Sequence, residues 1–388
     1  MKSTRPIYLD YMSTTPVDPR VAEAMASCLT MENDFGNPAS NTHQYGFEAK
    51  EKVDQARIEI ANLINANPRE IIFTSGATES INLALKGAAQ FYQRQGRHII
   101  TMATEHKAVL DTCQYLESTG FTVTYLKPEQ NGLLDLDKLN SAIQSDTILT
   151  SIMHVNNETG VIQDIQKIGG LLKSKGILFH VDAAQSAGKI DIDLKKLSVD
   201  LMSFSAHKIY GPKGIGALYI KSKPRVQLIT QIHGGDQENQ VRAGTLATHQ
   251  IVGMGKAFLI AQENRIVESK KIKNLRDLLW SNISVLDGLT LNGDLNNRID
   301  GCLNFSVDGV DGESLLASLY DLALSTGSAC NSANPEPSHV LLAMGLSRDA
   351  ANRSLRISIG RFTTEADIHH ASNRLIEQIK KLREIAPK

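Results

Sequence analysis

Lys208 is the side chain from which a chemical argument can start, because it stands in the stretch SFSAHK at residues 203–208, directly after a short apolar run. The run predicts a buried strand, so the lysine would lie where that strand ends. Burial disfavours an ammonium ion, and a neutral amine can form a Schiff base with an aldehyde coenzyme. The adjacent Ser205 and His207 are suitable ligands for a phosphate. Alone the stretch is weak evidence, since most such tetrapeptides lie in surface loops.

Asp182 also ends an apolar run, and Gln185 follows it three residues later. A buried carboxylate is costly unless it is paired, and a protonated pyridine nitrogen would pair it. The alternative is an aspartate that caps the next turn. His106 follows a third apolar run, where it could lie flat on an aromatic coenzyme ring or serve as a structural hydrogen-bonding group.

Residues 74–80, TSGATES, follow a predicted strand and begin a predicted helix. The free backbone N–H groups of such a helix start, at Ala77 and Thr78, could bind a phosphate. A plain helix N-cap with Glu79 in the first turn explains the same residues equally well. Asn157, in NNETG at residues 156–160, is a further polar group after a strand.

Cys330 lies in STGSACNS at residues 325–332, where small residues and the prolines that follow predict an exposed loop. A thiolate that solvent can reach is a usable nucleophile, although a surface cysteine without function would look the same. Cys28, Cys113 and Cys302 have no partners at metal-ligand or disulfide spacing and are expected to be packing residues. We expect no metal site.

These residues would be positioned by seven short apolar strands that alternate with helices, which predicts an α/β fold with one largely parallel sheet. The carboxyl ends of such strands face one crevice. The first thirty residues are expected to form an extended arm that ends in a turn. The predicted strands span residues 71–73, 99–102, 122–126, 148–153, 177–181, 201–204 and 217–220.

The pattern of apolar and charged residues changes after about residue 251, where a long charged helix is predicted, followed by a mixture of helices and a strand. This favours a second, smaller α+β domain. We predict a large coenzyme-binding domain at residues 17–258, and a small domain made of residues 1–16 and 259–388 that carries the cysteine loop, about 325–338.

Composition excludes several classes of protein. Forty-one basic and forty-two acidic side chains leave a formal charge of −1, which supports neither direct nucleic-acid binding nor a membrane-surface role. No apolar run has membrane length, and the first residues lack the apolar core of a secretion signal. We therefore expect a cytoplasmic protein.

Taken in order along nearly the whole chain, these motifs closely resemble the cysteine desulfurases of the IscS/NifS-like class, which depend on pyridoxal 5'-phosphate (PLP). The resemblance implies the PLP-dependent aminotransferase fold of type I. It is carried by residues 74–80, 105–107, 154–158, 180–185, 205–214 and 327–330. The arginine-containing RxGHHC pattern of the other desulfurase class is absent from this sequence.

The resemblance assigns each residue a role. Lys208 would hold the coenzyme covalently and later act as the base, Asp182 would pair the pyridine nitrogen and Gln185 the phenolic oxygen. Arg356, between apolar neighbours as on a half-buried strand, would hold the substrate α-carboxylate. Around the phosphate, the ring and the substrate, it places Ala77, Thr78, Ser205, His207, His106 and Asn157.

The resemblance further implies that L-cysteine becomes L-alanine, while Cys330 takes the sulfur as a persulfide. Sulfur would pass to an iron–sulfur scaffold protein or a transfer-RNA thiolation relay, and the persulfide could contact a nascent cluster. Thr245 would contribute its hydroxyl to the coenzyme phosphate of a second copy, so a homodimer is expected. Many relatives extend further at the C-terminus, and their tail helps to bind the scaffold.

Some departures from the family pattern and some rival functions remain at this point. Met12 and Ser13 replace small residues, and Ala184 replaces the usual threonine. A selenocysteine lyase, a related lyase or an aminotransferase of the same fold would share these motifs. A protein that uses the fold only for interactions is a rival from a different class.

Overall fold

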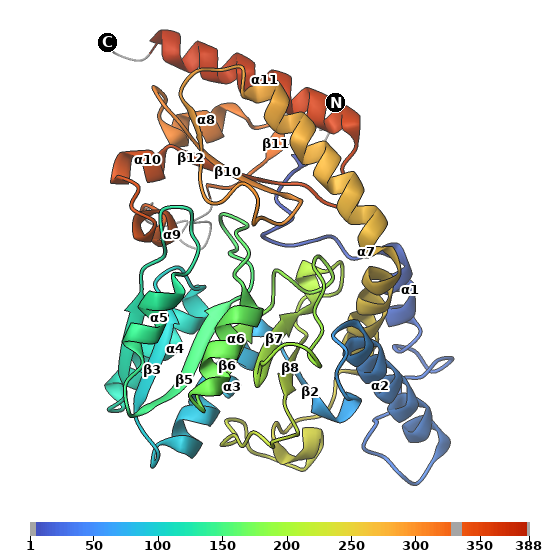
Figure 1. Ribbon diagram of the computed structural model, residues 1–388. Helices are drawn as coiled ribbons and strands as arrows, with labels where there is room; N and C mark the ends of the chain where they lie inside the picture. Colours follow the sequence, from blue (N-terminus) through green and yellow to red (C-terminus); the bar gives the residue numbers. More distant parts are fainter. Residues whose placement is uncertain (1–4, 327–335, 386–388) are drawn as a thin grey trace.

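A seven-stranded sheet forms the centre of the protein, whose computed structural model describes residues 5–326 and 336–385 (Figure 1). The strands follow the order β2-β8-β7-β6-β5-β3-β4, all parallel except β8, which is antiparallel to both neighbours. Each predicted strand begins and ends within one residue of an observed one, so the predicted sheet is confirmed. The strands are β2 (Ile71–Thr74), β3 (His98–Met102), β4 (Thr122–Leu126), β5 (Thr147–Met153), β6 (Leu178–Asp182), β7 (Leu201–Ser205) and β8 (Gly216–Ile220).

Both faces of this sheet are buried, because successive side chains along a strand point to opposite sides. Leu201 belongs to the core on one face and Met202 to the core on the other. Helices α3 (Ala77–Tyr92) and α4 (Lys107–Ser118) cover the first face. The second face is covered by α2 (Gln44–Leu63), α6 (Ile165–Ser174) and the start of α7 (Thr248–Ile283). A further short helix, α5 (Leu136–Ala142), precedes β5.

A second core lies beyond the sheet, around three antiparallel strands in the order β12-β10-β9. Its strands are β9 (Leu289–Leu291), β10 (Cys302–Val307) and β12 (Ser354–Ser358), and its helices include α8 (Gly312–Ser318) and α11 (Glu365–Ile385). Helix α7 runs through both parts: Met254 packs in the sheet core and Leu279 in the second core (Figure 1). The predicted domain boundary after residue 258 falls inside this helix and stays a prediction.

Smaller elements complete the described chain. They are β1 (Ile7–Tyr8), which pairs with β11 (Leu322–Ala323), the helices α1 (Pro19–Ala26), α9 (His339–Ala343) and α10 (Arg348–Asn352), and the 3-10 turns η1 (Pro68–Glu70), η2 (Ala206–Lys208) and η3 (Gln237–Gln240).

The expectation of an extended arm over the first thirty residues is wrong for α1. Asp18 caps this helix by accepting a hydrogen bond from the Arg20 N–H group at 3.0 Å, and Pro19 occupies the first helical turn. Proline is well suited there because its missing N–H is not needed and its φ is already helical. The Asp-Pro pair was interpreted as a turn, although it is also a helix-start signal.

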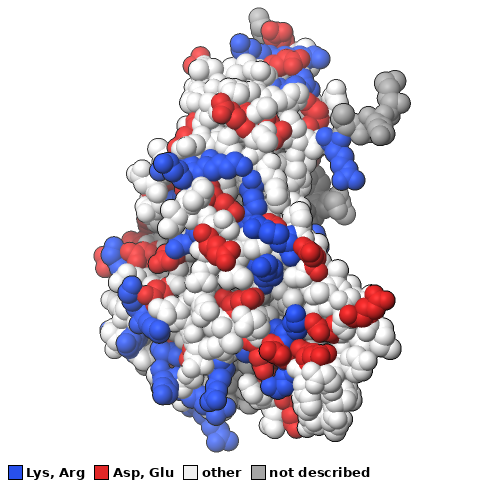
Figure 2. All heavy atoms as spheres, turned by 90° about the vertical axis from the view of Figure 1, so that its right-hand side faces the viewer, with Lys and Arg blue, Asp and Glu red and all other residues white. Residues whose placement is uncertain are grey.

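The surface drawn in Figure 2 carries basic and acidic side chains that are interspersed over both parts of the molecule. This face therefore presents no extended field of one sign. Within the described ranges, none of the helices is both long enough and apolar enough to span a membrane.

Candidate active site

Ten of the predicted site residues line one cavity of about 440 Å³ at the carboxyl edge of the sheet. They come from the ends of β2, β3, β5, β6 and β7 and from the middle of β12, so both parts of the molecule contribute. These residues are Ala77, Thr78, His106, Asn157, Asp182, Gln185, Ser205, His207, Lys208 and Arg356.

Lys208 ends the turn η2, which follows β7 directly. Its Nζ donates hydrogen bonds to the backbone carbonyl oxygens of Met12 at 2.8 Å and Ser13 at 2.6 Å. The N-terminal arm thus passes beside the lysine and supplies two neutral acceptors. The amine also interacts electrostatically with the carboxyl group of Asp182.

Asp182 is the last residue of β6, and its side chain is 5% exposed. Burial raises the pKa of this carboxyl group, while the Ala184 N–H group, at 2.9 Å from Oδ1, and the charges of His106 and Lys208 lower it. A carboxylate at this depth requires a cationic partner. The site therefore fits a ligand that presents a positive charge at this point.

His106 caps helix α4, and its Nδ1 accepts a hydrogen bond from the Ala108 N–H group at 3.1 Å. This acceptor role leaves the proton of the neutral ring on Nε2. Burial lowers the pKa of His106, and the nearby Asp182 opposes that effect. The neutral ring is thus the form that faces the cavity near pH 7. Glu105 beside it is fully buried, and burial raises its pKa well above the usual range.

The start of α3 is open toward the cavity. No side chain caps this helix, and Gly76 before it has φ +156°, where an added Cβ would meet nothing within 4 Å. Glu79 instead accepts from the Ser75 N–H group at 2.8 Å and pairs with Arg242 at 2.8 Å. The unpaired N–H groups and the positive end of the helix dipole make this a seat for an anion.

His207 and Ser205 border the same end of the cavity. The Nδ1 atom of His207 lies 3.1 Å from the Thr14 hydroxyl oxygen. Burial and the charges of Lys208, Lys213 and Lys189 lower the pKa of His207 to about 4. His207 is therefore a neutral hydrogen-bonding group at this seat.

Gln185 has both ends of its amide engaged. Its Nε2 donates to the Met12 carbonyl oxygen at 2.7 Å, and its Oε1 accepts from Lys189 Nζ at 2.8 Å. The second hydrogen of Nε2 leaves a donor for a ligand. Sequence reasoning noted Met12 only as a departure and missed Lys189, because neither has a local pattern that signals this contact.

Arg356 lies in the middle of β12 and is 3% exposed, so it is more deeply buried than the predicted half-buried strand. Its Nη2 binds Asp10 at 2.7 Å, and its Nη1 donates to the Asn157 carbonyl oxygen at 2.9 Å. The Arg356 Nε and the Asn157 Oδ1 are buried and have no hydrogen-bond partner among the described residues. Buried polar atoms are rarely left unpaired, which points to a polar ligand between them.

The family model that describes class-V aminotransferases matches residues 7–370. The chain belongs to this family. It is 58% identical over 382 residues to the protein named "Cysteine desulfurase IscS" of Shewanella denitrificans, an alignment that covers 98% of this chain and 95% of the relative. This identity confirms the predicted membership of the IscS/NifS-like class.

Solved structures agree with this class-V assignment. A structure named "NIFS-LIKE PROTEIN" superposes with a TM-score of 0.88 at 38% identity and covers 98% of this chain and 99% of the other. Another, named "SspA in complex with cysteine", has a TM-score of 0.83 at 40% identity and covers 92% of this chain and all of the other.

Two predicted residues of this class-V chain remain to be placed. Cys330 lies outside the described residues. Thr245 lies on a different hollow of about 560 Å³, together with Arg57 and Glu238. The resemblance assigns Thr245 to the site of a second copy, and a single chain does not test that assignment.

On each side of residues 327–335, a described residue is hydrogen-bonded to a residue that lines the cavity or is adjacent in sequence to one that does. On one side, the Arg356 N–H group donates to the Ser325 carbonyl oxygen at 2.7 Å. On the other, the Ser338 hydroxyl donates to the buried carboxylate of Glu158, which adjoins Asn157. Sequence reasoning missed Glu158 and Asp10 as supports of the site.

Proposed function

We propose that the protein is a PLP-dependent cysteine desulfurase, which converts L-cysteine to L-alanine and transfers the sulfur to Cys330 as a persulfide. The observation that carries the proposal is that Asp182 and Lys208 open onto one cavity, with an uncapped helix start at its other end. A buried carboxylate, an amine and an anion seat match the pyridine nitrogen, the aldehyde and the phosphate of PLP. Class-V membership and the cysteine-bound relative support the same conclusion.

The residues that would hold PLP follow from this match. Lys208 would bind it covalently and Asp182 would pair with its ring nitrogen, while Gln185 would donate to its phenolic oxygen and His106 would lie against its ring. When bound, PLP supplies an electron sink for the electron pair that remains after the substrate α-proton leaves. The phosphate would be bound by Ala77, Thr78, Ser205 and His207, with Thr245 from a second copy.

The chain's own groups would perform the remaining steps. Arg356 would bind the α-carboxylate of L-cysteine through charge-assisted hydrogen bonds. Asn157, whose Oδ1 has no partner among the described residues, would contact the substrate beside Arg356. Lys208 would act as the base that takes the α-proton of the substrate and returns a proton to the product. The neutral His106 ring is able to relay a proton within the cavity.

The sulfur step requires a thiolate at Cys330. Its sulfur forms a bond to the substrate sulfur, the carbon–sulfur bond of the substrate breaks, and the carbon that held the sulfur takes up a proton. One L-cysteine and one thiol therefore give one L-alanine and one persulfide, and no oxidant or reductant is consumed.

The acceptor of the persulfide sulfur is a second part of the proposal. We expect it to pass to an iron–sulfur scaffold protein or to a transfer-RNA thiolation relay, in the cytoplasm and from a homodimer. The name of the 58% identical relatives supports a place in sulfur delivery.

Incubation with isotope-labelled L-cysteine tests the function. We expect one labelled alanine per labelled sulfur on Cys330, detected by mass spectrometry of the intact chain and its peptides. Cys330→Ser should keep the visible absorbance of bound coenzyme and lose the persulfide, whereas Cys113→Ser, which changes a buried packing cysteine, should keep both. Selenide release from selenocysteine with no sulfur transfer from L-cysteine, or amino transfer to a keto acid, would show that the proposal is wrong.

A further inference from the structure

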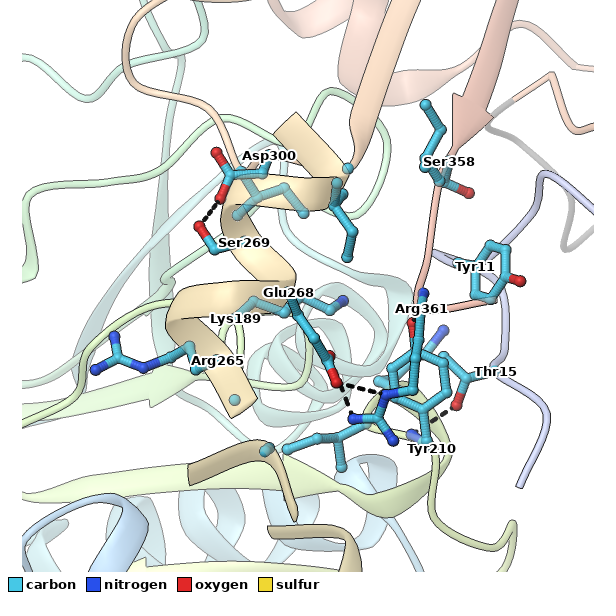
Figure 3. A pocket seen from close by; sticks show the side chains of 18 of the residues that line it. Tyr11, Thr15, Lys189, Tyr210, Arg265, Glu268, Ser269, Asp300, Ser358 and Arg361 are labelled. Carbon is cyan, nitrogen blue, oxygen red and sulfur yellow. Dashed lines mark hydrogen bonds and ion pairs between the residues drawn. The ribbon is translucent and has the colours of Figure 1, made fainter. Parts of the chain in front are cut away.

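Lys189 is a partly buried lysine whose position the reaction outlined above does not explain. It lines a second cavity of about 60 Å³, behind Lys208, which lies between the two parts of the molecule (Figure 3). Figure 3 shows its amino group pointing from the α7 side of this cavity toward the Tyr11 side. Met12 and Lys208 line both this cavity and the larger one, so they form the wall between the two.

No carboxylate compensates the charge of Lys189 within the described part of the chain. Two acids line the same cavity, but Glu268 pairs with Arg361 at 2.8 Å and Asp300 accepts a hydrogen bond from the Ser269 hydroxyl (Figure 3). The Nζ of Lys189 instead donates to Gln185 Oε1 at 2.8 Å and lies 3.9 Å from the sulfur of Met12. An amine withdrawn from water without a counter-ion is costly, so a lysine at this position is a candidate for a functional use.

The charged groups that face Lys189 from the neighbouring elements are cationic. Lys208 approaches from η2 and Arg356 from β12, and among the described residues the Cys302 thiol of β10 acts on the pKa of Lys189 in the opposite direction. Burial and these cations lower the pKa of Lys189 to about 7. By the same Coulombic interaction, a protonated Lys189 disfavours a positive charge on the nitrogen of Lys208.

The contacts of Lys189 also decide how the Gln185 amide is turned. The oxygen and nitrogen of an amide exchange places in a half-turn, and a protonated lysine has only donors, so the amide oxygen faces Lys189 in that form. The nitrogen is then directed to the Met12 carbonyl at 2.7 Å, which accepts from Lys208 at 2.8 Å as well. One row of hydrogen bonds thus joins Lys189, Gln185, Met12 and Lys208.

We propose that Lys189 is a positioning residue for the coenzyme site: it turns the Gln185 amide so that its nitrogen is the donor at the cavity wall, and it holds a second positive charge near Lys208. This inference rests on the coenzyme of the proposed function but not on the substrate. The residue acts through Gln185 and Lys208 and does not itself touch substrate.

Lys189→Met in the holoenzyme tests the proposal, with the exposed Lys195→Met as the matched control. Loss of the neighbouring positive charge favours protonation of the Lys208 nitrogen, so the midpoint of the pH titration of the coenzyme absorbance should rise by about half a unit to one unit. Loss of a hydrogen bond that fixes Gln185 should speed coenzyme release by about 5- to 10-fold. If Lys189→Met titrates and releases coenzyme as Lys195→Met does, the proposal is overturned.

Two further variants separate the effect of the Lys189 hydrogen bond from the effect of its charge. Lys189→Gln keeps a donor toward Gln185 without the charge, so it should restore slow coenzyme release and leave the titration shifted; release as fast as in Lys189→Met overturns the role in turning the amide. In a Gln185→Ala background, Lys189→Met should accelerate release no further, and additive effects would contradict action through Gln185. Both readouts need only bound coenzyme, whereas failure to form alanine and persulfide from L-cysteine would count against the proposed function instead.

Discussion

Ser338→Ala should destabilise the protein more than the loss of an ordinary helix cap. Ser338 is 3% exposed, accepts from the Leu341 N–H group at 3.1 Å at the start of α9, and donates its hydroxyl to the buried carboxylate of Glu158. Loss of an N-cap costs about 1 kcal/mol. A buried carboxylate left without its donor adds about 1–3 kcal/mol. The free energy of unfolding should therefore fall by a total of about 2–4 kcal/mol.

Ser347→Ala is the matched control, because Ser347 caps the equally short helix α10 through the Ala350 N–H group at 3.1 Å but is exposed and binds no carboxylate among the described residues. It should cost only about 1 kcal/mol. Urea denaturation followed by circular dichroism measures both values. Equal losses in the two variants would refute the role of Glu158.

The difference between these variants should depend on pH. Burial raises the pKa of Glu158, and the Ser338 hydrogen bond lowers it, so removal of the hydroxyl raises the pKa further. A folded-state pKa above the unfolded value contributes stability that is present at low pH and lost as pH rises through the folded pKa. Ser338→Ala should consequently lose more stability at pH 8 than at pH 5, whereas the loss in Ser347→Ala should be the same at both.

Three further outcomes are expected. Arg356→Lys replaces a two-pronged contact by a single ammonium, so KM for L-cysteine should rise by about 10- to 100-fold with a smaller change in kcat, in steady-state alanine assays; an unchanged KM would contradict carboxylate binding by Arg356. Asp182→Asn removes the charge opposite the ring nitrogen, and kcat should fall on the order of 10²- to 10³-fold while the coenzyme stays bound, as its absorbance would report. Glu105→Gln should leave stability nearly unchanged at pH 7, because burial already raises the pKa of Glu105 well above its usual value and keeps it protonated; a loss like that of Ser338→Ala in urea denaturation would show that it is ionised.

Much of the sheet and the cavity was predictable because the signals are local. Strands buried on both faces appear as continuous apolar runs, and Asp182, His106, Asn157 and Lys208 each stand directly after such a run. Parallel strands bring their carboxyl ends to one edge, so the convergence of these residues follows from the topology alone.

The supports of the site were not predictable in this way. The bond from Arg356 to Asp10 joins residues 346 positions apart, and the contact of Ser338 with Glu158 joins residues 180 apart. No periodicity or turn signal encodes such pairs. Lys189 and Gln185 are only four residues apart in the sequence. The surroundings of Lys189, however, depend on the second cavity, which forms only when α7 and the N-terminal arm are in place.

The contacts of the N-terminal arm have a consequence for the synthesis of the protein on the ribosome. Met12 and Ser13 bind Lys208, and Asp10 binds Arg356, so the arm contains a group whose partner is synthesised 346 residues later. If Arg356 binds the substrate carboxylate as proposed above, a nascent chain in which β12 is still inside the ribosome would be unable to hold the amino acid in this way. The sulfur chemistry proposed above would thereby be withheld from unfinished chains, which would otherwise release a reactive sulfur species with no partner to receive it.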